Sequence, residues 1–484
     1  MHRVTWSRRL RIPRMGANDT AELDEAVDWL RSRAHEVSAA GQRADDFADL
    51  EWLRDAVGDA RLVALGEATH GTHEFFAMKL RLLQFMVTEL RFSAFAIEAS
   101  WAEANLVNQF VHTGQGDPHA LLKGMGFWTW NTQEVLDLIL WIRKHNKDAP
   151  PEQAVSFFGF DVQYPRMAIE NVLEFLGRVD PPARTTAELR YAKLQEYLVR
   201  SAALPDDRAT RLKLVFEGRQ RPERLPRRVQ RRVRQGLRRV HEDLERNRER
   251  YVRASSHADF AFALRSARVV VQAEKFVTPP SPGRIKQLRM RAGRVGRSLL
   301  RRQWRLPEWG GRDQAMAENV GWLLERAGPT AKMVLWAHDL HVMTIPGSMG
   351  ADLRNRFHEE LLVCAFAFHH GRFTACEIGQ RPEEIGPPLP QHAPVPPEDS
   401  YEAALHGLGI PSFIVDLRDP NSAVPRWLRG PRPFRTVGAT YSEALAPSFF
   451  LPMVLPRQSD MLVYFDESTP SHYLGPDSTP SVPK

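Results

Sequence analysis

Two residues of the segment GEATHGTHE have the types and spacing of a general-base pair. Glu67 and His70 lie three residues apart in a turn that also contains Gly66 and Gly71. An imidazole titrates near about 6.5, and a neighbouring carboxylate raises that value while it orients the ring. A His–Glu pair can therefore take a proton from water at neutral pH, and the segment predicts a general base. The alternative is that Glu67 and His70 only cap the following helix.

Further ionisable side chains follow three other apolar runs of the chain. Glu98 ends the second run, Asp161 ends the third, and His338 and His341 follow the fourth. In open parallel sheets ligands bind beyond the carboxyl ends of the strands, because loops gather polar groups there. We expect Glu98 and His338 to join the general-base pair as catalytic residues. Asp161 has a second interpretation as a helix cap, and His338 has one as a histidine that bonds only to backbone.

The four apolar runs predict the strands that position these side chains. They lack polar alternation, which is typical of parallel strands covered on both faces by helices, and they span residues 60–67, 92–99, 154–161 and 332–339. Helical patterns fall between and beside them, at 74–90, 101–111, 131–146 and 312–328. The helix at 131–146 is predicted to begin with a capping box of Asn131 and Glu134. This alternation predicts an α/β fold with a mostly parallel sheet flanked by helices.

Two later segments have weaker patterns. Residues 360–379 resemble a hairpin or an adjacent strand pair around the sequence HHGR. Residues 381–400 are rich in proline and are predicted to form a loop.

The composition is that of a folded, water-soluble protein. The chain has 484 residues, of which 43% are hydrophobic and 26% charged, and its mean hydropathy is -0.40. No apolar run approaches the roughly 20 residues of a membrane helix. The only two cysteines, Cys364 and Cys376, cannot form a disulfide framework for a chain of this length, and they fit a reducing compartment. We therefore expect a cytoplasmic protein.

The positive charge of the chain is concentrated in one segment. The net charge is +7, but residues 201–310 hold 29 Lys and Arg against 11 Asp and Glu, so the rest of the chain is negative. Helical spacing in this segment predicts a long Arg-rich helical insertion at 179–305. The catalytic α/β domain is then expected at 25–178 and 306–470. The N-terminal extension (1–24) is expected to be flexible and the tail (471–484) disordered.

A metal centre and several cofactor classes are disfavoured by the spacing of the motifs. The residues that could supply ligands are Glu67, His70, His73, Glu98, His338 and His341. Their spacing matches no known zinc pattern, since GEATHGTH lacks the two-His helical face of HExxH. The chain also has no G-x-S-x-G elbow, no Walker loop and no G-x-G-x-x-G after a strand. We expect no metal and no cofactor.

Six motifs together resemble those of the erythromycin esterase family. They are, in chain order, LGEATHGTHEFF, FAIEASWAE, FWTWNTQEVLDLILWIRKHN, FFGFDVQ, RDQAMAENV and VLWAHDLHV. The resemblance covers roughly residues 45–170 and 310–345 and continues more loosely to 462–469. It implies an α/β protein with a helical insertion that acts as a hydrolase. Characterised members hydrolyse the macrolactone ester of macrolide antibiotics without a required metal.

By motif position, the resemblance implies roles for four residues. His70 corresponds to the general base, Glu67 to its acidic neighbour, Glu98 to a second essential carboxylate and His338 to the distal histidine. Lys79 departs from the family, because macrolide esterases have an arginine there, and a lysine offers a point charge in place of a bidentate fork. The sequence HDLH also replaces an HNAH-like sequence.

These observations predict a carboxylic ester or lactone hydrolase, with a macrolide as one possible substrate and antibiotic resistance as its context. Water activated by His70 would attack the carbonyl, and Lys79 with His338 would steady the oxyanion. Lys79 and the remaining ionisable residues near the motifs are expected to contact the substrate: His73, Asp161 and His341.

Two alternatives remain open at this point. A non-esterase member of the superfamily could hold a ligand such as haem through His70 and His338. The basic insertion could bind a polyanion, although a solvated helical face is the simpler interpretation. The insertion has almost no interleaved aromatics, so nucleic acid is not expected as a partner, nor is a membrane. The expected partner is a small-molecule ester or lactone, and the oligomeric state is left open.

Overall fold

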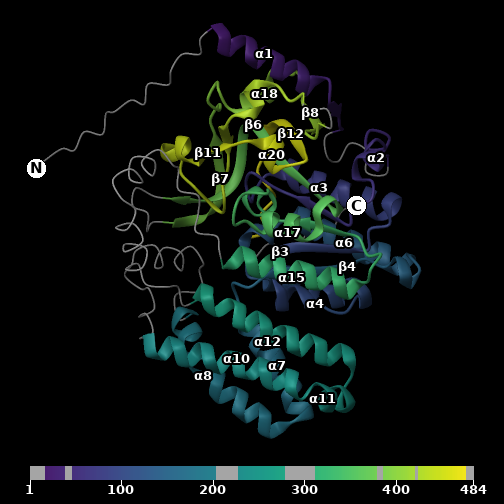
Figure 1. The fold of residues 1–484 in the computed structure, drawn as a ribbon, viewed down its shortest axis with the longest axis vertical. Coiled ribbons are helices and arrows are strands. Elements are labelled where there is room, and N and C mark those ends of the chain that lie inside the picture. Colours follow the sequence, from purple (N-terminus) through teal and green to yellow (C-terminus); the bar gives the residue numbers. More distant parts are fainter. Residues whose placement is uncertain are drawn as a thin grey trace, which may run out of the picture.

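A large sheet flanked by helices forms the body of the protein, and a bundle of helices packs beside it (Figure 1). The computed structural model describes residues 17–38, 46–202, 227–277, 311–378, 385–419 and 423–475. Within these residues no helix is both long and apolar enough to cross a bilayer.

Ten of the described strands make up the main sheet. Its principal order is β1-β8-β12-β6-β2-β5-β3-β4, and β7 and β10 each pair with β6. The six strands from β12 to β4 run parallel, whereas β8 and β7 are antiparallel to their neighbours. The bounds are β1 Ala34–Glu36, β2 Leu62–Leu65, β3 Ala94–Ser100, β4 Ser156–Asp161, β5 Met333–Trp336, β6 Leu361–Ile378, β7 Ile385–Ala393, β8 Ser412–Asp416, β10 Thr440–Tyr441 and β12 Met461–Ser468. The structure confirms the predicted α/β class with a mostly parallel sheet.

The order of the strands brings the predicted site residues to one edge of the sheet. β5 comes after β3 and β4 in the chain, yet it inserts between β2 and β3. In the register of these strands, both Leu65 and Ile97 lie opposite Trp336. The carboxyl ends of the three strands are therefore level, and the residues that follow them become neighbours.

Helices cover both faces of the central strands, which explains their lack of polar alternation. Val63 and Leu65 of β2 lie in the apolar cluster that includes α3, whereas Leu62 and Ala64 lie in the cluster that includes α15. Every residue of β2 is buried as a result. The predicted helices are present as α3 His73–Leu90, α4 Trp101–Thr113, α6 Gln133–Asp148 and α15 Arg312–Ala327.

The predicted capping box of α6 is wrong. Thr132 is the N-cap, and its hydroxyl accepts a hydrogen bond from the backbone N–H of Val135. Asn131 instead donates its side-chain amide to the carbonyl of Gly475. The carboxylate of Glu134 does not reach back to the helix start, because it binds two histidines.

The segment at 360–379 is not a hairpin. Residues 361–378 form the single long strand β6, which pairs with β12 along its first part and with β7 along its second. Gly371 allows this continuity, since its φ is 124° and a Cβ there would meet the backbone of Ser468. The antiparallel partner of the second part of β6 is β7, which lies within the proline-rich segment. That segment was predicted to be a loop. β7 tolerates prolines because β6 is its only partner among the described strands.

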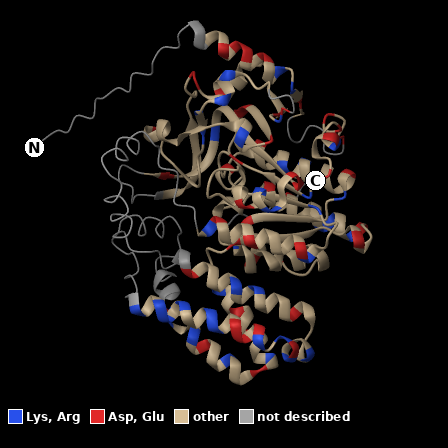
Figure 2. Ribbon diagram, in the orientation of Figure 1, with Lys and Arg blue, Asp and Glu red and all other residues tan. Residues whose placement is uncertain are grey.

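The described parts of the basic segment are helical. They form α8 Pro181–Ala202, α10 Arg227–Arg246, α11 Arg248–Ala254 and α12 His257–Val277, which pack with α7 Arg166–Val179. Figure 2 shows many Lys and Arg residues along α10. The apolar stripe of α10 is buried in the bundle and consists of Val233, Leu237, Val240 and Leu244. Residues 203–226 and 278–305 of the expected insertion lie outside the described residues.

Both expected terminal segments contain ordered structure. α1 Ala17–Arg31 buries Ala26 and Leu30 against the β8 and β12 side of the sheet, so residues 17–24 belong to the folded domain. At the other end, Tyr473 forms a β-bridge with Thr132, so the expected tail begins later than residue 471. Residues 1–16 and 476–484 lie outside the described residues.

Short elements complete the described structure. A second, two-stranded sheet pairs β9 Arg432–Arg435 with β11 Phe450–Met453. The remaining α-helices are α2 Leu53–Val57, α5 Pro118–Gly124, α16 Asp339–Val342, α17 Met349–Phe357, α18 Tyr401–His406, α19 Arg426–Arg429 and α20 Leu455–Gln458. Short 3-10 helices lie at Trp128–Trp130, Pro151–Gln153, His358–Glu360 and Glu443–Phe449.

The turn after β2 depends on a close backbone approach at Gly71. A Cβ added there would lie 2.0 Å from the carbonyl oxygen of Thr374, so Gly71→Ala forces the backbone apart. We expect the variant to lose about 1–3 kcal/mol of unfolding free energy, measured by urea denaturation. Gly124→Ala is the control, because nothing lies within 4 Å of its added Cβ. Equal stability of the two variants would contradict the proposed close packing.

Candidate active site

Glu67 is the buried anchor of the site at the end of β2. Its side chain is fully buried, and its carboxylate accepts three hydrogen bonds. Lys79 Nζ donates to Oε2 at 2.6 Å, Trp336 Nε1 donates to Oε2 at 2.7 Å, and His70 Nδ1 donates to Oε1 at 2.6 Å. Burial alone would raise the pKa of Glu67, but Lys79 and His70 hold that pKa below its ordinary value. The carboxylate is therefore charged at neutral pH.

Lys79 supports Glu67 and does not reach the substrate side, contrary to the sequence-based expectation. Its side chain on α3 is fully buried, and its ammonium lies 4.3 Å from the ring centroid of Trp336. Burial lowers the pKa of Lys79 to about 8, against the opposing effect of Glu67. Asp339, the other departure from the family pattern, is also fully buried and close enough to act on the Lys79 charge. Both departures lie next to Glu67, since the backbone N–H of Asp339 donates to the Glu67 carbonyl at 2.9 Å.

His70 has one ring nitrogen bound and one open. Nδ1 donates to Glu67, while Nε2 has no hydrogen-bond partner among the described residues. The side chain is 12% exposed, and its ring packs edge-on against Trp130 and 5.1 Å from the ring centroid of His338. With the proton held on Nδ1, the lone pair of Nε2 is available to accept a proton.

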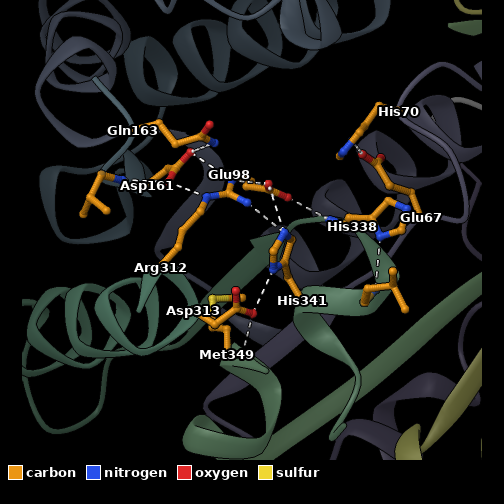
Figure 3. A network of polar contacts seen from close by, with 12 residues as sticks. Glu67, His70, Glu98, Asp161, Gln163, Arg312, Asp313, His338, His341 and Met349 are labelled. Atoms are coloured by element: carbon orange, nitrogen blue, oxygen red, sulfur yellow. Dashed lines mark hydrogen bonds and ion pairs between the residues drawn. The ribbon is translucent and has the colours of Figure 1, made fainter. Parts of the chain in front are cut away.

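Glu98 lies in a second buried network, which centres on Arg312 (Figure 3). Arg312 donates two hydrogen bonds to Asp161, both at 3.0 Å, and one to Glu98 Oε1 at 2.5 Å. Glu98 Oε2 accepts from the backbone N–H of His338 at 3.0 Å. Burial would raise the pKa of Glu98, but His341 and Arg312 hold it well below its ordinary value. Glu98 thus ties β3 to the turn after β5.

Asp161 and His341 face this network, although the sequence indicated them as substrate contacts. Asp161 is fully buried and is held by Arg312, by Gln163 and by the backbone N–H of Val162. His341 Nδ1 lies 2.8 Å from Asp313 Oδ2, and its Nε2 lies 3.0 Å from Arg312 Nη1 and 3.4 Å from Glu98 Oε1. Both side chains hold the site together in this structure.

His338 also has both ring nitrogens occupied. Nδ1 accepts from the backbone N–H of Leu340, so Nε2 carries the proton and donates to the carbonyl of Val437 at 3.1 Å. Burial, together with the neighbouring imidazoles of His70 and His341, lowers the pKa of His338 to about 3. His338 is therefore neutral and does not offer the free N–H that an oxyanion contact requires.

His73 belongs to a separate cluster. Its Nδ1 donates to Glu134 at 2.7 Å, and its ring lies edge-on to His472. Among the described residues, two groups of His, Asp and Glu have ligand atoms close enough for a shared metal ion, and neither includes His70. The cluster around the general base is thus separate from both.

The sequence reasoning missed the residues that hold this site together. Arg312, Asp313 and Trp336 each bind a predicted site residue. A signal for Arg312 was present, because RDQ opens the helix that precedes β5 and belongs to one of the six motifs. Trp336 had none, since a tryptophan in an apolar run is indistinguishable from a core residue.

Comparison with known proteins identifies the family of the chain. A family model for erythromycin esterase matches residues 87–468, which is most of the chain. The chain belongs to the erythromycin esterase family. Membership of this family indicates a hydrolase of the superfamily.

Two curated proteins are similar to this chain, one over a short part of it and one over most of it. An erythromycin esterase type II from Escherichia coli is 32% identical over 135 residues, which cover 28% of this chain and 31% of that protein. A putative hydrolase, YbfO, from Bacillus subtilis (strain 168) is 22% identical over 457 residues, which cover 92% of this chain and 91% of that protein.

Solved structures share the fold of this erythromycin esterase family member. A succinoglycan biosynthesis protein has a TM-score of 0.71 at 21% identity, with 93% of this chain and 98% of that chain covered. An erythromycin esterase mutant in its open conformation has a TM-score of 0.62 at 17% identity, with coverage of 91% and 98%. At these identities the likeness concerns the fold alone.

The Arg312 network predicts a large stability loss when its cation is removed. Arg312→Met leaves Asp161 and Glu98 buried without their counterion, so we expect a loss of about 3–5 kcal/mol in a urea unfolding measurement. Arg166→Met is the control, because the Arg166 side chain is 84% exposed and its one ion pair among the described residues is with Glu170 on the same helix. That exposed pair is worth about 0.3–0.5 kcal/mol. A similar loss in both variants would show that the network is not essential.

Glu103, on α4, predicts a pH dependence of stability. Burial raises its pKa from 4.5 to about 7, and Oε2 has no hydrogen-bond partner among the described residues. Because the folded pKa is the higher one, the contribution of Glu103 to stability is lost as pH rises from about 4.5 through 7, by up to about 3 kcal/mol. Relative to the wild type, Glu103→Gln should gain stability over this range in denaturation at several pH values. A constant difference across the range would refute the shifted pKa.

Proposed function

We propose that this protein hydrolyses a carboxylic ester or lactone with water activated by His70. The observation that carries the proposal is the buried sequence of contacts from Lys79 through Glu67 to His70, which leaves Nε2 of the imidazole open. A neutral imidazole with a charged carboxylate on its other nitrogen is suited to general-base catalysis. Membership of the erythromycin esterase family supports ester hydrolysis as the reaction class.

In the proposed reaction, His70 Nε2 takes a proton from water as the water oxygen attacks the carbonyl carbon. The imidazolium that forms is stabilised by the charge of Glu67, and Lys79 keeps that carboxylate ionised. The proton on His70 then passes to the leaving oxygen, so the net reaction consumes one water. No covalent intermediate on the protein is required.

Glu98 and His338 act as positioning residues in this proposal. Glu98 is bound to Arg312 and to the backbone of His338, and His338 packs beside the base. Their bonds fix the turn after β5 against the turn after β2, which holds the His70 ring in place. This differs from the sequence-based expectation that Lys79 and His338 contact the oxyanion, since Lys79 is fully buried against Glu67 and both ring nitrogens of His338 are occupied.

The proposed substrate is a small-molecule ester or lactone, and macrolides are the first class to test because of the family. Polyanion binding is not proposed, since several arginines of the helical bundle already pair with carboxylates, including Arg190 with Asp243 and Arg234 with Glu274. We propose a cytoplasmic location, which the two buried free cysteines support.

Removal of the base tests the proposal directly. Purified protein is screened against macrolides and simple aryl esters, and kcat/KM is measured for any substrate found. We expect His70→Ala to lower kcat/KM by at least about 100-fold, because a positioned general base contributes about 10²–10⁴. Glu67→Gln should show a loss of similar size, since an amide cannot stabilise the imidazolium.

His257→Ala is the matched control, because His257 is exposed at the start of α12 in the helical bundle. It should keep the wild-type rate, and circular dichroism should show that all three variants fold. Undiminished turnover by His70→Ala would overturn the proposal. Haem binding through His70, seen as a Soret band without turnover of any ester, would favour a ligand-binding role instead.

A further inference from the structure

A cluster of two histidines and a glutamate lies beside the catalytic turn, outside the site described above. His73 opens α3, Glu134 lies in the first turn of α6, and His472 belongs to the segment after β12. Nδ1 of each histidine lies 2.7 Å from the same carboxylate oxygen, Oε1 of Glu134. Three potential ligand atoms from three parts of the chain therefore converge at one point.

We propose that His73, Glu134 and His472 bind a single divalent transition-metal ion of the zinc class. Two imidazoles and one carboxylate form a donor set that suits Zn²⁺ or Co²⁺, whereas Ca²⁺ and Mg²⁺ prefer oxygen ligands alone. Zinc sits about 2.0–2.1 Å from such donors and separates neighbouring ones by about 3.3 Å. Each histidine nitrogen would thus move about 0.6 Å away from the carboxylate oxygen, and the Nδ1 protons would leave on binding.

The charge around the cluster favours a cation. Glu134 is 5% exposed, and Glu74 and Asp137 both act electrostatically on His73. Burial raises the pKa of Asp137, and the neighbouring charge of Glu134 raises it further, as expected where carboxylates crowd together. A dication at this point would relieve that repulsion.

The backbone around the cluster holds the ligands in place before any ion binds. His73 N donates to the carbonyl of Thr469, Ser471 N donates to that of Gly71, and Gln133 N donates to that of His472, each at 2.9 Å. The side chain of His472 is 67% exposed, so the fourth coordination position faces solvent. The bound ion would tie the C-terminal segment to the turn that carries the general base.

A second group of the same type lies elsewhere in the described structure. His369, His370 and Asp466 also have ligand atoms within 4.8 Å of one another. There, however, Asp466 Oδ1 is already bound by His406 and by the hydroxyl of Tyr464, which are not part of the group. In the His73 cluster the side-chain partners of the carboxylate are the proposed ligands themselves, so we assign the ion to that cluster.

Metal binding itself tests the proposal, independently of ester turnover. The full chain without a histidine tag is stripped with a chelator, desalted and titrated with Co²⁺ while the visible absorption is followed. We expect saturation at one equivalent and displacement by one equivalent of Zn²⁺. Competition with a chromophoric chelator then gives the zinc affinity, and excess zinc should raise Tm.

Two ligand variants and two controls make the test specific. His472→Ala and His73→Ala should each weaken zinc binding by more than about 100-fold, because even outer partners of metal ligands are worth 10–100-fold. His472 is exposed, so that variant should fold normally. His257→Ala, remote from both groups, and His370→Ala, in the second group, should bind zinc as the wild type does.

Three results would overturn the assignment. They are the absence of stoichiometric binding to the wild type, an unchanged affinity in His472→Ala and His73→Ala, and a loss of binding in His370→Ala. Metal binding and ester turnover are measured separately. Failure of the metal proposal can therefore be distinguished from failure of the proposed hydrolase function.

Discussion

The buried ion pair between Lys79 and Glu67 is the interaction on which the rest of the site depends. Removing two charges from water is costly, and the pair is tolerable only if the remaining donors and acceptors are satisfied. Trp336 and His70 supply two further hydrogen bonds to the carboxylate. This arrangement requires β5 to lie between β2 and β3, and it requires α3 to cover the face that Lys79 enters. The orientation of the base is thus a consequence of the sheet topology.

The Arg312 network complements this pair from the other side of the site. It joins the start of α15 to the ends of β3 and β4, and it continues through His341 to Asp313. The two networks meet where His338 donates its backbone N–H to Glu98 and packs its ring near His70. A catalytic group needs a rigid support. Buried charged groups whose hydrogen bonds are satisfied provide such a support.

Sequence reasoning predicted the elements better than the roles of the side chains. Three of the four strands lie within the predicted apolar runs and β3 ends one residue beyond its run, and Glu67 contacts His70 as their three-residue spacing indicated. Lys79, Asp161 and His341 were expected to face the substrate but are engaged in the supporting networks. Their partners are distant in the chain, since Asp161 and Arg312 are 151 residues apart. No local pattern reports such a pairing. The hairpin prediction around Gly371 failed for a similar reason. β6 pairs with β12 before that residue and with β7 after it, and both partners are distant in the chain.

By itself, the sequence determined the α/β class, the location of the positive charge, and a histidine with a carboxylate in the turn after the first core strand. These properties depend on periodicity, composition and short spacing, which are local. Only the tertiary structure decided which ionisable side chains are paired and which nitrogen stays open, and it alone brought His472 to His73 and Glu134. The physical reason is that a buried charge must find a partner, and the order of the strands decides which distant residue comes within reach.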